Sequence, residues 1–151
     1  MSKKIKMCVI GAGHGGKAMA AHLATMGFTT NLYNRSDDHI YAIRELGGVD
    51  LESYENGPRG FARLNRVTSN IQEAVEGVNM IMVVVPSSAH ADVAKACAPH
   101  LVDGQVIVLH PGRTCGAIEF AKVLKDNGCT ADVTVSEAET FIYASRSDGP
   151  A

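Results

Sequence analysis

Short apolar runs alternate with helix-like segments along the chain, and this alternation predicts an α/β fold. Short β-like runs predict strands at residues 4–10, 29–33, 66–68, 80–85, 105–109 and 133–135, with a seventh expected at 140–145. Segments rich in Ala, Leu and charged residues predict helices at 15–26, 37–46, 71–75, 89–98 and 115–127. This order indicates a doubly wound, mostly parallel sheet with helices on both faces.

Local signals refine these boundaries. The run 80–85 is apolar at six consecutive positions, which predicts a strand buried on both faces of a parallel sheet. The stretch 49–65 contains a Gly-Pro pair and a further glycine, so we expect an irregular connection there. Gly27 is predicted to end the first helix, and Ser87 or Ser88 to cap the helix that follows them.

Composition narrows the classes of protein that fit. With 151 residues, 46% apolar and 20% charged, the chain is predicted to be one soluble domain spanning 1–151. A net charge of -2 argues against binding to nucleic acid or to an anionic membrane. The longest strongly apolar run, 80–86, is far shorter than a membrane span. The 4 cysteines are scattered without metal-ligand spacing, which predicts reduced thiols in a cytoplasmic protein and no metal site.

A glycine-rich loop lies between the first predicted strand and the first predicted helix. Its pattern, G-x-G-x-x-G, is formed by Gly11, Gly13 and Gly16. In a dinucleotide-binding loop the first glycine permits the tight turn, the second lets the backbone approach the pyrophosphate, and the third lets the helix lie close to the strand. The context therefore predicts a Rossmann-type fold that holds NADP(H) or NAD(H) at the positive end of the helix.

Three further residues of this loop are candidates. Gly15 is expected to border the cofactor with the other glycines. His14 either flanks the pyrophosphate or points to solvent. Lys17 is either a phosphate contact or a solvated lysine, and the sequence favours solvation.

The end of the second strand bears on the choice of dinucleotide. An acidic residue there bonds the ribose 2′-OH and favours NAD, but here Asn34 stands at that position. Arg35 offers a planar, permanently charged group that suits a 2′-phosphate, and Ser36 adds a hydroxyl. This run favours NADP(H) and leaves NAD(H) open, because Arg35 can instead stack on adenine or point to solvent.

Ligands of open α/β sheets lie beyond the carboxyl ends of the strands, so the later strand ends supply more candidates. The residues expected to border the nicotinamide side of the cofactor are Val85, Pro86, Ser87, Pro111 and Gly112. The substrate-side candidates are His90, His110, Arg113 and Glu137, with Glu139 nearby. Each has a plainer alternative: a helix start for His90, a core residue for His110, and solvated groups for Arg113 and the two acids. His110 is also a candidate acid–base group, because its ordinary pKa is near neutral.

Four blocks of sequence have a recognisable combination of residues: GAGHGG at 11–16, VVPSSAH at 84–90, PGRTCGAIEF at 111–120 and SEAET at 136–140. Together they cover nearly the whole chain and resemble the N-terminal domain of the octopine/nopaline (opine) dehydrogenase family. The glycine loop is shared with many dehydrogenases, whereas the last two blocks are more specific. Asn34 and Arg35 stand where the NAD-using members of the family have an acidic residue.

The resemblance implies an oxidoreductase that uses NAD(P)H to couple an amino acid to a 2-oxo acid. It also implies a second, all-helical domain with a catalytic histidine assisted by an acid. The chain contains no nucleophile–base motif, so we expect it to be the cofactor half of such an enzyme, a fragment inactive alone, with no catalytic residue of its own. Apolar surface left where a second domain docks is expected to permit a homodimer.

Two alternatives remain at this point. Dehydrogenases that resemble glycerol-3-phosphate dehydrogenase or ketopantoate reductase also place such a loop before an all-α domain, and Asn34-Arg35-Ser36 suits the latter. The other alternative is a stand-alone module that senses NADP(H) or NAD(H) without catalysis.

Overall fold

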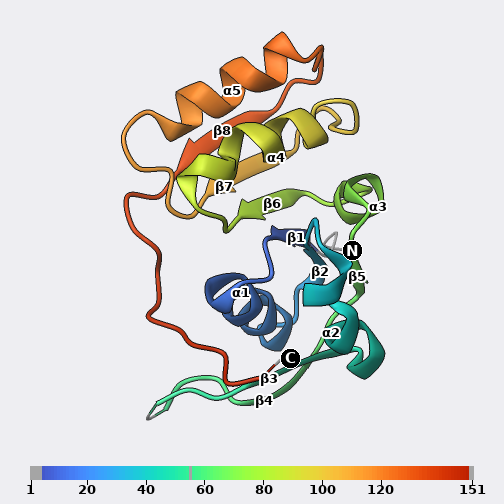
Figure 1. Cartoon of the computed structure of the whole chain (residues 1–151), viewed down its shortest axis with the longest axis vertical. Helices are drawn as coiled ribbons and strands as arrows, with labels where there is room; N and C mark the ends of the chain where they lie inside the picture. Colours follow the sequence, from blue (N-terminus) through green and yellow to red (C-terminus); the bar gives the residue numbers. More distant parts are fainter. Residues whose placement is uncertain (1–4, 55, 150–151) are drawn as a thin grey trace.

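One parallel sheet of six strands forms the centre of the protein (Figure 1). The computed structural model describes residues 5–54 and 56–149. In spatial order the strands are β5 (Arg66–Thr68), β2 (Thr29–Tyr33), β1 (Lys6–Ile10), β6 (Met80–Val83), β7 (Val106–Leu109) and β8 (Thr134–Glu137). All five pairings are parallel. The order reverses at β1, whose two neighbours lead to opposite edges of the sheet, as in doubly wound dinucleotide-binding folds.

Helices cover both faces of this sheet, as the alternation of the sequence predicts. On one face α1 (His14–Thr25) lies over β1 and β2, and α2 (Tyr41–Leu46) packs beside β5. On the other face lie α3 (Ile71–Val75), α4 (His90–Cys97) and α5 (Gly116–Asp126). Successive residues of β1 enter the two cores in turn: Cys8 and Ile10 pack with α4 and α5, whereas Val9 packs with α1. The doubly wound fold is therefore confirmed.

The most apolar predicted strand is shorter and less buried than expected. β6 ends at Val83 rather than at residue 85, although the Val84 N–H still donates to the Ile10 carbonyl at 2.8 Å. Ile81 and Val83 are fully buried beneath α4 and α5, whereas Met80 and Met82 are only half-buried. The prediction of burial on both faces was wrong here, because α1 lies over β1 and β2 rather than over β6.

A β-hairpin replaces the irregular connection expected at 49–65. It consists of β3 (Gly48–Leu51) and β4 (Gly60–Arg63), which pair antiparallel apart from the main sheet. Val49 and Ala62 are buried together against α1 and fix the hairpin on that face. The prediction was wrong because each strand has only four residues and their alternation is obscured by the glycines around them.

Two predicted helices begin with a 3-10 turn. The helix predicted at 37–46 divides into a 3-10 turn, Asp37–His39, and α2. The turn Ser87–Ala89 precedes α4, whose N-cap is Ala89, so the prediction of a serine cap was wrong. Gly27 follows α1 in the left-handed conformation, with φ +90°, as its position after the helix predicts.

No strand forms at 140–145, where a seventh was predicted. Residues 138–149, called the strap below, leave β8 and run alongside α1 in an irregular conformation (Figure 1, red). Phe141 and Tyr143 of the strap pack on the core around α1. Apolar residues do alternate along this segment, but their side chains pack on a helix and the backbone does not pair with a neighbouring strand.

Among the residues that the structure describes, no helix is both long and apolar enough to cross a membrane. The four cysteines are free thiols, and burial raises the pKa of Cys97 to about 12. The described ranges contain no group of three or more His, Cys, Asp or Glu side chains arranged for a metal ion.

Helix α5 offers a test of the core that it covers. Phe120 is fully buried whereas Ile118, on the same helix, is 71% exposed. Phe120→Ala is expected to lower the free energy of unfolding by about 3–5 kcal/mol, because it removes a buried ring and leaves a cavity. Ile118→Ala is the matched control and should change it by less than about 0.5 kcal/mol. Urea unfolding followed by circular dichroism measures both, and equal losses would contradict the packing described.

Candidate functional site

The carboxyl ends of β1, β2, β6 and β7 meet at one edge of the sheet, since all four strands are parallel. The glycine loop follows β1, at the point where the strand order reverses. In open α/β sheets this crevice is where ligands bind. The fold therefore brings the predicted loop, Asn34 and the segments after β6 and β7 to one edge.

Gly11 and Gly16 are required by the close approach of α1 to β1. Gly11 has φ +109°, and a Cβ there would lie 2.2 Å from the Val84 carbonyl oxygen. A Cβ on Gly16 would lie 1.7 Å from the Gly11 carbonyl oxygen. Neither position admits a side chain, which matches the first and third roles in a dinucleotide-binding loop.

Gly13 has a different environment, as the second role requires. Its φ is -73°, which any residue adopts, and a Cβ there would meet no atom within 4 Å. Gly13 is the N-cap of α1, where no side chain caps the helix and the first turn holds no acidic residue. There is therefore open space beside Gly13 at the positive end of α1. The N–H groups of a first helical turn have no partner within the helix, so this end fits a diphosphate.

Asn34 joins the glycine loop to the end of β2. Its Oδ1 accepts the Ala12 N–H at 3.2 Å, and its Nδ2 donates to the Ser36 carbonyl at 3.0 Å. An amide does both, whereas a carboxylate accepts only. Arg35 is exposed beside this bridge. The first acidic residue after β2, Asp37, is bonded by Arg44 and by the Ser69 hydroxyl, and its pKa is lowered chiefly by the Arg44 bond.

The strap takes up both polar side chains at the start of α1. The Ser147 N–H donates to His14 Nδ1 at 2.9 Å. Lys17 Nζ donates to the Ser147 hydroxyl at 3.2 Å and to the Gly149 carbonyl at 3.1 Å. Lys17 is only 8% exposed, so the prediction of a solvated lysine was wrong. We did not predict from the sequence that the strap lies at the start of α1. The signal that could have indicated it is Gly15, an additional glycine in the loop.

The segment after β6 lies against the glycine loop. A Cβ on Gly11 would lie 2.8 Å from Val85 Cγ1, so Val85 packs against the loop. The role of Val85, Pro86 and Ser87 beside the nicotinamide stays a prediction. His90 is buried and bonded to the Val85 backbone, and burial lowers its pKa. His90 thus supports this segment from within.

Glu137 holds the segment after β7 in place. Its Oε2 accepts the Ala117 N–H at 2.6 Å in the first turn of α5. A Cβ on Gly112 would lie 2.2 Å from the Glu137 Cβ, so the segment that begins at Pro111 fits closely beside β8. Arg113 is exposed, with φ +55°, and Glu139 is exposed as well. A substrate contact by Arg113 or Glu137 remains a prediction.

His110 directly follows β7 and is 8% exposed. Within the described residues both of its ring nitrogens are buried without a hydrogen-bond partner, as is Nε2 of His90. Burial lowers the pKa of His110, which favours the neutral ring. An unpaired buried donor and acceptor cost free energy. A role for His110 beside the substrate or as an acid–base group stays a prediction.

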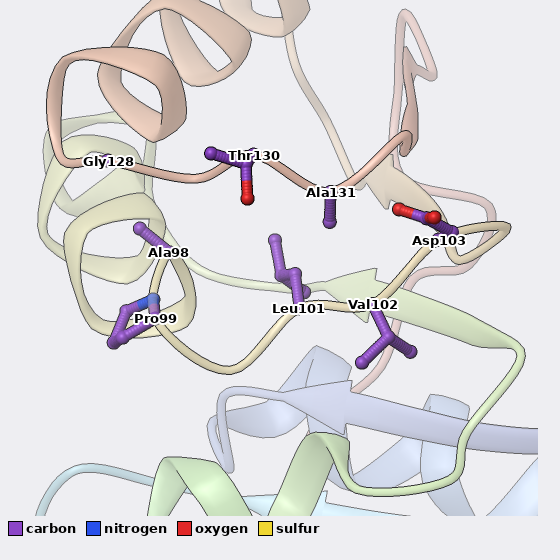
Figure 2. Close-up of a pocket in the computed structure, with 8 residues that line it drawn as sticks. All are labelled: Ala98, Pro99, Leu101, Val102, Asp103, Gly128, Thr130 and Ala131. Carbon is purple, nitrogen blue, oxygen red and sulfur yellow. The ribbon is translucent and has the colours of Figure 1, made fainter.

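A hollow of about 450 Å³ lies at the opposite edge of the sheet (Figure 2). Leu101, Val102 and Asp103, which precede β7, line it together with Ala131, which precedes β8. Because these residues stand at the amino ends of the strands, the hollow is distinct from the edge that carries the glycine loop.

Alanine substitutions in the loop separate binding from folding. Gly13→Ala is expected to leave the free energy of unfolding within about 0.5 kcal/mol of the parent, since the new Cβ meets open space. It should nevertheless abolish dinucleotide binding, because the methyl group lies where the diphosphate approaches. Gly16→Ala should instead destabilise the fold by about 1–3 kcal/mol or more. Unfolding curves and calorimetry with NADPH and NADH check both, and a Gly13→Ala variant that binds normally would refute the assignment.

The buried histidines predict a pH dependence of stability. Their pKa values in the folded state lie below the ordinary 6.5, so the unfolded chain binds more protons between the two values. The free energy of unfolding should therefore fall as the pH drops through 6.5. His110→Gln should make this fall shallower, as urea unfolding between neutral and acidic pH would measure. An unchanged slope would show that His110 does not contribute.

Comparison with known proteins agrees with the geometry. Residues 6–114 match the family described as NAD-dependent glycerol-3-phosphate dehydrogenase N-terminus. Opine dehydrogenase of Arthrobacter sp. (strain 1C) is 37% identical over 142 residues, which are 94% of this chain and 39% of that enzyme. The chain thus spans well under half the length of this relative.

Solved structures extend the likeness of fold. Octopine dehydrogenase with NADH and L-arginine matches with a TM-score of 0.78 at 24% identity, over 93% of this chain and 36% of that one. Yersinopine dehydrogenase with NADP+ matches with a TM-score of 0.70 at 18% identity, over 90% and 35%. These structures share the fold of this chain. By the match over residues 6–114, the chain belongs to the family of NAD-dependent glycerol-3-phosphate dehydrogenase N-terminal domains, with an opine dehydrogenase among its relatives.

Proposed function

We propose that this chain is the cofactor-binding part of an NAD(P)H-dependent oxidoreductase of the opine dehydrogenase type. Its substrates would be an amino acid and a 2-oxo acid, and the bond reduced would be the C–N bond of their imine. The observation that carries the proposal is the open, uncapped start of α1 at Gly13, set at the point where the strand order reverses. The similarity to the Arthrobacter opine dehydrogenase over 94% of the chain supports the substrate class.

The extent of that similarity favours the opine type over the glycerol-3-phosphate dehydrogenase type. The family model for the latter ends at residue 114, before α5 and β8. The match to the opine dehydrogenase covers 142 residues and so continues into these elements. Glu137 and Ala117, which join β8 to α5, lie in this additional part.

Each group at the sheet edge has a part in holding the cofactor. The N–H groups at the start of α1 would bind the diphosphate, and Asn34 to Ser36 would surround the adenine ribose. The segments at Val85 and Pro111 would border the nicotinamide, where His110 offers a buried donor and acceptor. When bound, the cofactor supplies the hydride.

NADP(H) is the cofactor that this site favours, with NAD(H) as the alternative. Asn34 places no carboxylate at the end of β2, and Arg35 stands exposed beside it. Asp37, the nearest following acid, is paired with Arg44 and is thereby partly neutralised. Similar folds have been solved both with NADH and with NADP+, so the residues after β2 decide the preference.

The acid that protonates the substrate is expected to come from outside this chain. Residues 1–151 would then form one domain that binds the cofactor in the cytoplasm without turning over substrate. The half-buried Met80 and Met82 on the face beside α1 leave apolar surface that suits a second domain or a homodimer contact.

Cofactor preference can be tested at Arg35 and Asn34. Arg35→Ala is expected to weaken NADPH binding about tenfold or more and NADH binding much less, because it removes a charge-assisted contact to the 2′-phosphate. Asn34→Asp should weaken NADPH further by repulsion. Calorimetry of the 151-residue chain and of each variant measures the dissociation constants for NADPH and NADH.

Lys125→Ala is the matched control, since it removes one positive charge from the last turn of α5. Equal losses for both cofactors in Arg35→Ala would overturn the NADP(H) preference while leaving the dinucleotide site intact. Absence of binding by the parent chain to either cofactor would overturn the proposed function.

A further inference from the structure

Gly15 is a fourth glycine that the dinucleotide-binding pattern does not require. The three roles of that pattern belong to Gly11, Gly13 and Gly16. A Cβ on Gly15 would lie 2.9 Å from Cζ and 3.0 Å from Cε1 of Phe141, a residue of the strap. Gly15 therefore makes room for the Phe141 ring, so that the strap docks directly on the first turn of α1.

The strap is bonded to α1 at several further points. Tyr143 packs edge-on against Phe141, with ring centroids 5.4 Å apart, and its hydroxyl lies 2.8 Å from His22 Nδ1. Lys17 Nζ donates to Ser147 and Gly149, as described above. Apolar contacts, an aromatic pair and a buried ammonium thus hold the strap along the helix that carries the candidate diphosphate site.

One of these contacts determines what the His14 ring can do. His14 is the first residue of α1, directly after Gly13, and it is exposed. Its Nδ1 accepts the Ser147 N–H at 2.9 Å. A neutral imidazole that accepts at Nδ1 carries its proton at Nε2, so the other nitrogen is a donor. The contact therefore fixes both the tautomer and the orientation of a donor at the start of α1.

We propose that the strap is part of the dinucleotide site: the Ser147 N–H is a positioning group that holds His14 as an Nε2–H donor to the diphosphate of the cofactor. This inference rests on the proposed cofactor binding. Anionic diphosphate oxygens accept hydrogen bonds, and the N–H groups of the first turn are donors of the same kind. The site then consists of the first turn of α1 and of the strap, in which Ser147 lies 130 residues after Lys17 in the sequence.

Calorimetry of the 151-residue chain with NADPH tests the role of His14. His14→Ala is expected to raise the dissociation constant about tenfold or more, because a hydrogen bond to a charged group is lost. His100→Ala is the matched control, since His100 lies near the amino end of β7, at the opposite edge of the sheet, and it should leave the constant unchanged. Thermal unfolding of each variant shows that the fold is retained.

Two substitutions at Ser147 test the positioning step. Ser147→Pro removes the N–H and should weaken NADPH binding nearly as much as His14→Ala. Ser147→Ala removes only the hydroxyl and should weaken it less, since the N–H remains. The double variant His14→Ala with Ser147→Pro should be no weaker than His14→Ala alone, because both changes remove the same donor.

Nitrogen NMR of the His14 ring supplies a readout that a purely structural strap would not change. The parent chain should show the Nε2–H tautomer, and Ser147→Pro should show a mixture of tautomers. Equal NADPH affinity in the parent and His14→Ala would overturn the inference while leaving the proposed function in place. Loss of affinity in His14→Ala without loss in Ser147→Pro would overturn the role of the strap. Absence of NADPH and NADH binding in the parent would overturn the proposed function itself.

Discussion

The approach of α1 to β1 is the constraint on which the rest of the structure depends. A single methyl group on Gly16 would lie 1.7 Å from the Gly11 carbonyl, so the helix can lie this close to the strand only without a side chain there. The same approach directs the start of α1 toward the carboxyl edge of the sheet. It also brings Val84 and Val85 against Gly11, which joins the two halves of the sheet at their centre. The geometry of the candidate diphosphate site is thus a consequence of backbone packing more than of any polar side chain.

Much of the fold can be predicted from the sequence because its periodicity is strong. All six strands of the parallel sheet lie where their apolar runs predict, and the glycines of the loop occupy the places that the pattern assigns. The hairpin at Gly48–Leu51 and Gly60–Arg63 was missed, because its strands are short and are identified by the burial of Val49 and Ala62 against a helix distant in sequence. Part of the strap was predicted as a strand. An alternating apolar run predicts that side chains are buried, but it does not show whether they pack on a helix or beside another strand.

The candidate site also contains residues that could be predicted from the sequence and residues that could not. The residues whose packing role depends on the backbone, Gly11 and Gly16, could be predicted from spacing alone. Residues whose role depends on a distant partner could not: Lys17 is buried by Gly149, and Glu137 bonds the first turn of α5. Asn34 is intermediate, since its position was evident but its bridge between Ala12 and Ser36 required coordinates. Long-range contacts of this kind leave no local signal in one sequence.

Gly15 and Phe141 form a single steric unit, although their residue numbers differ by 126. The volume available to one is set by the other: a larger residue at 15 requires a smaller one at 141, or a strap displaced from α1. Neither position can therefore change independently without disturbing the start of the helix. In a set of related sequences such a pair would appear as correlated substitution, and that correlation would trace the path of the strap across the domain.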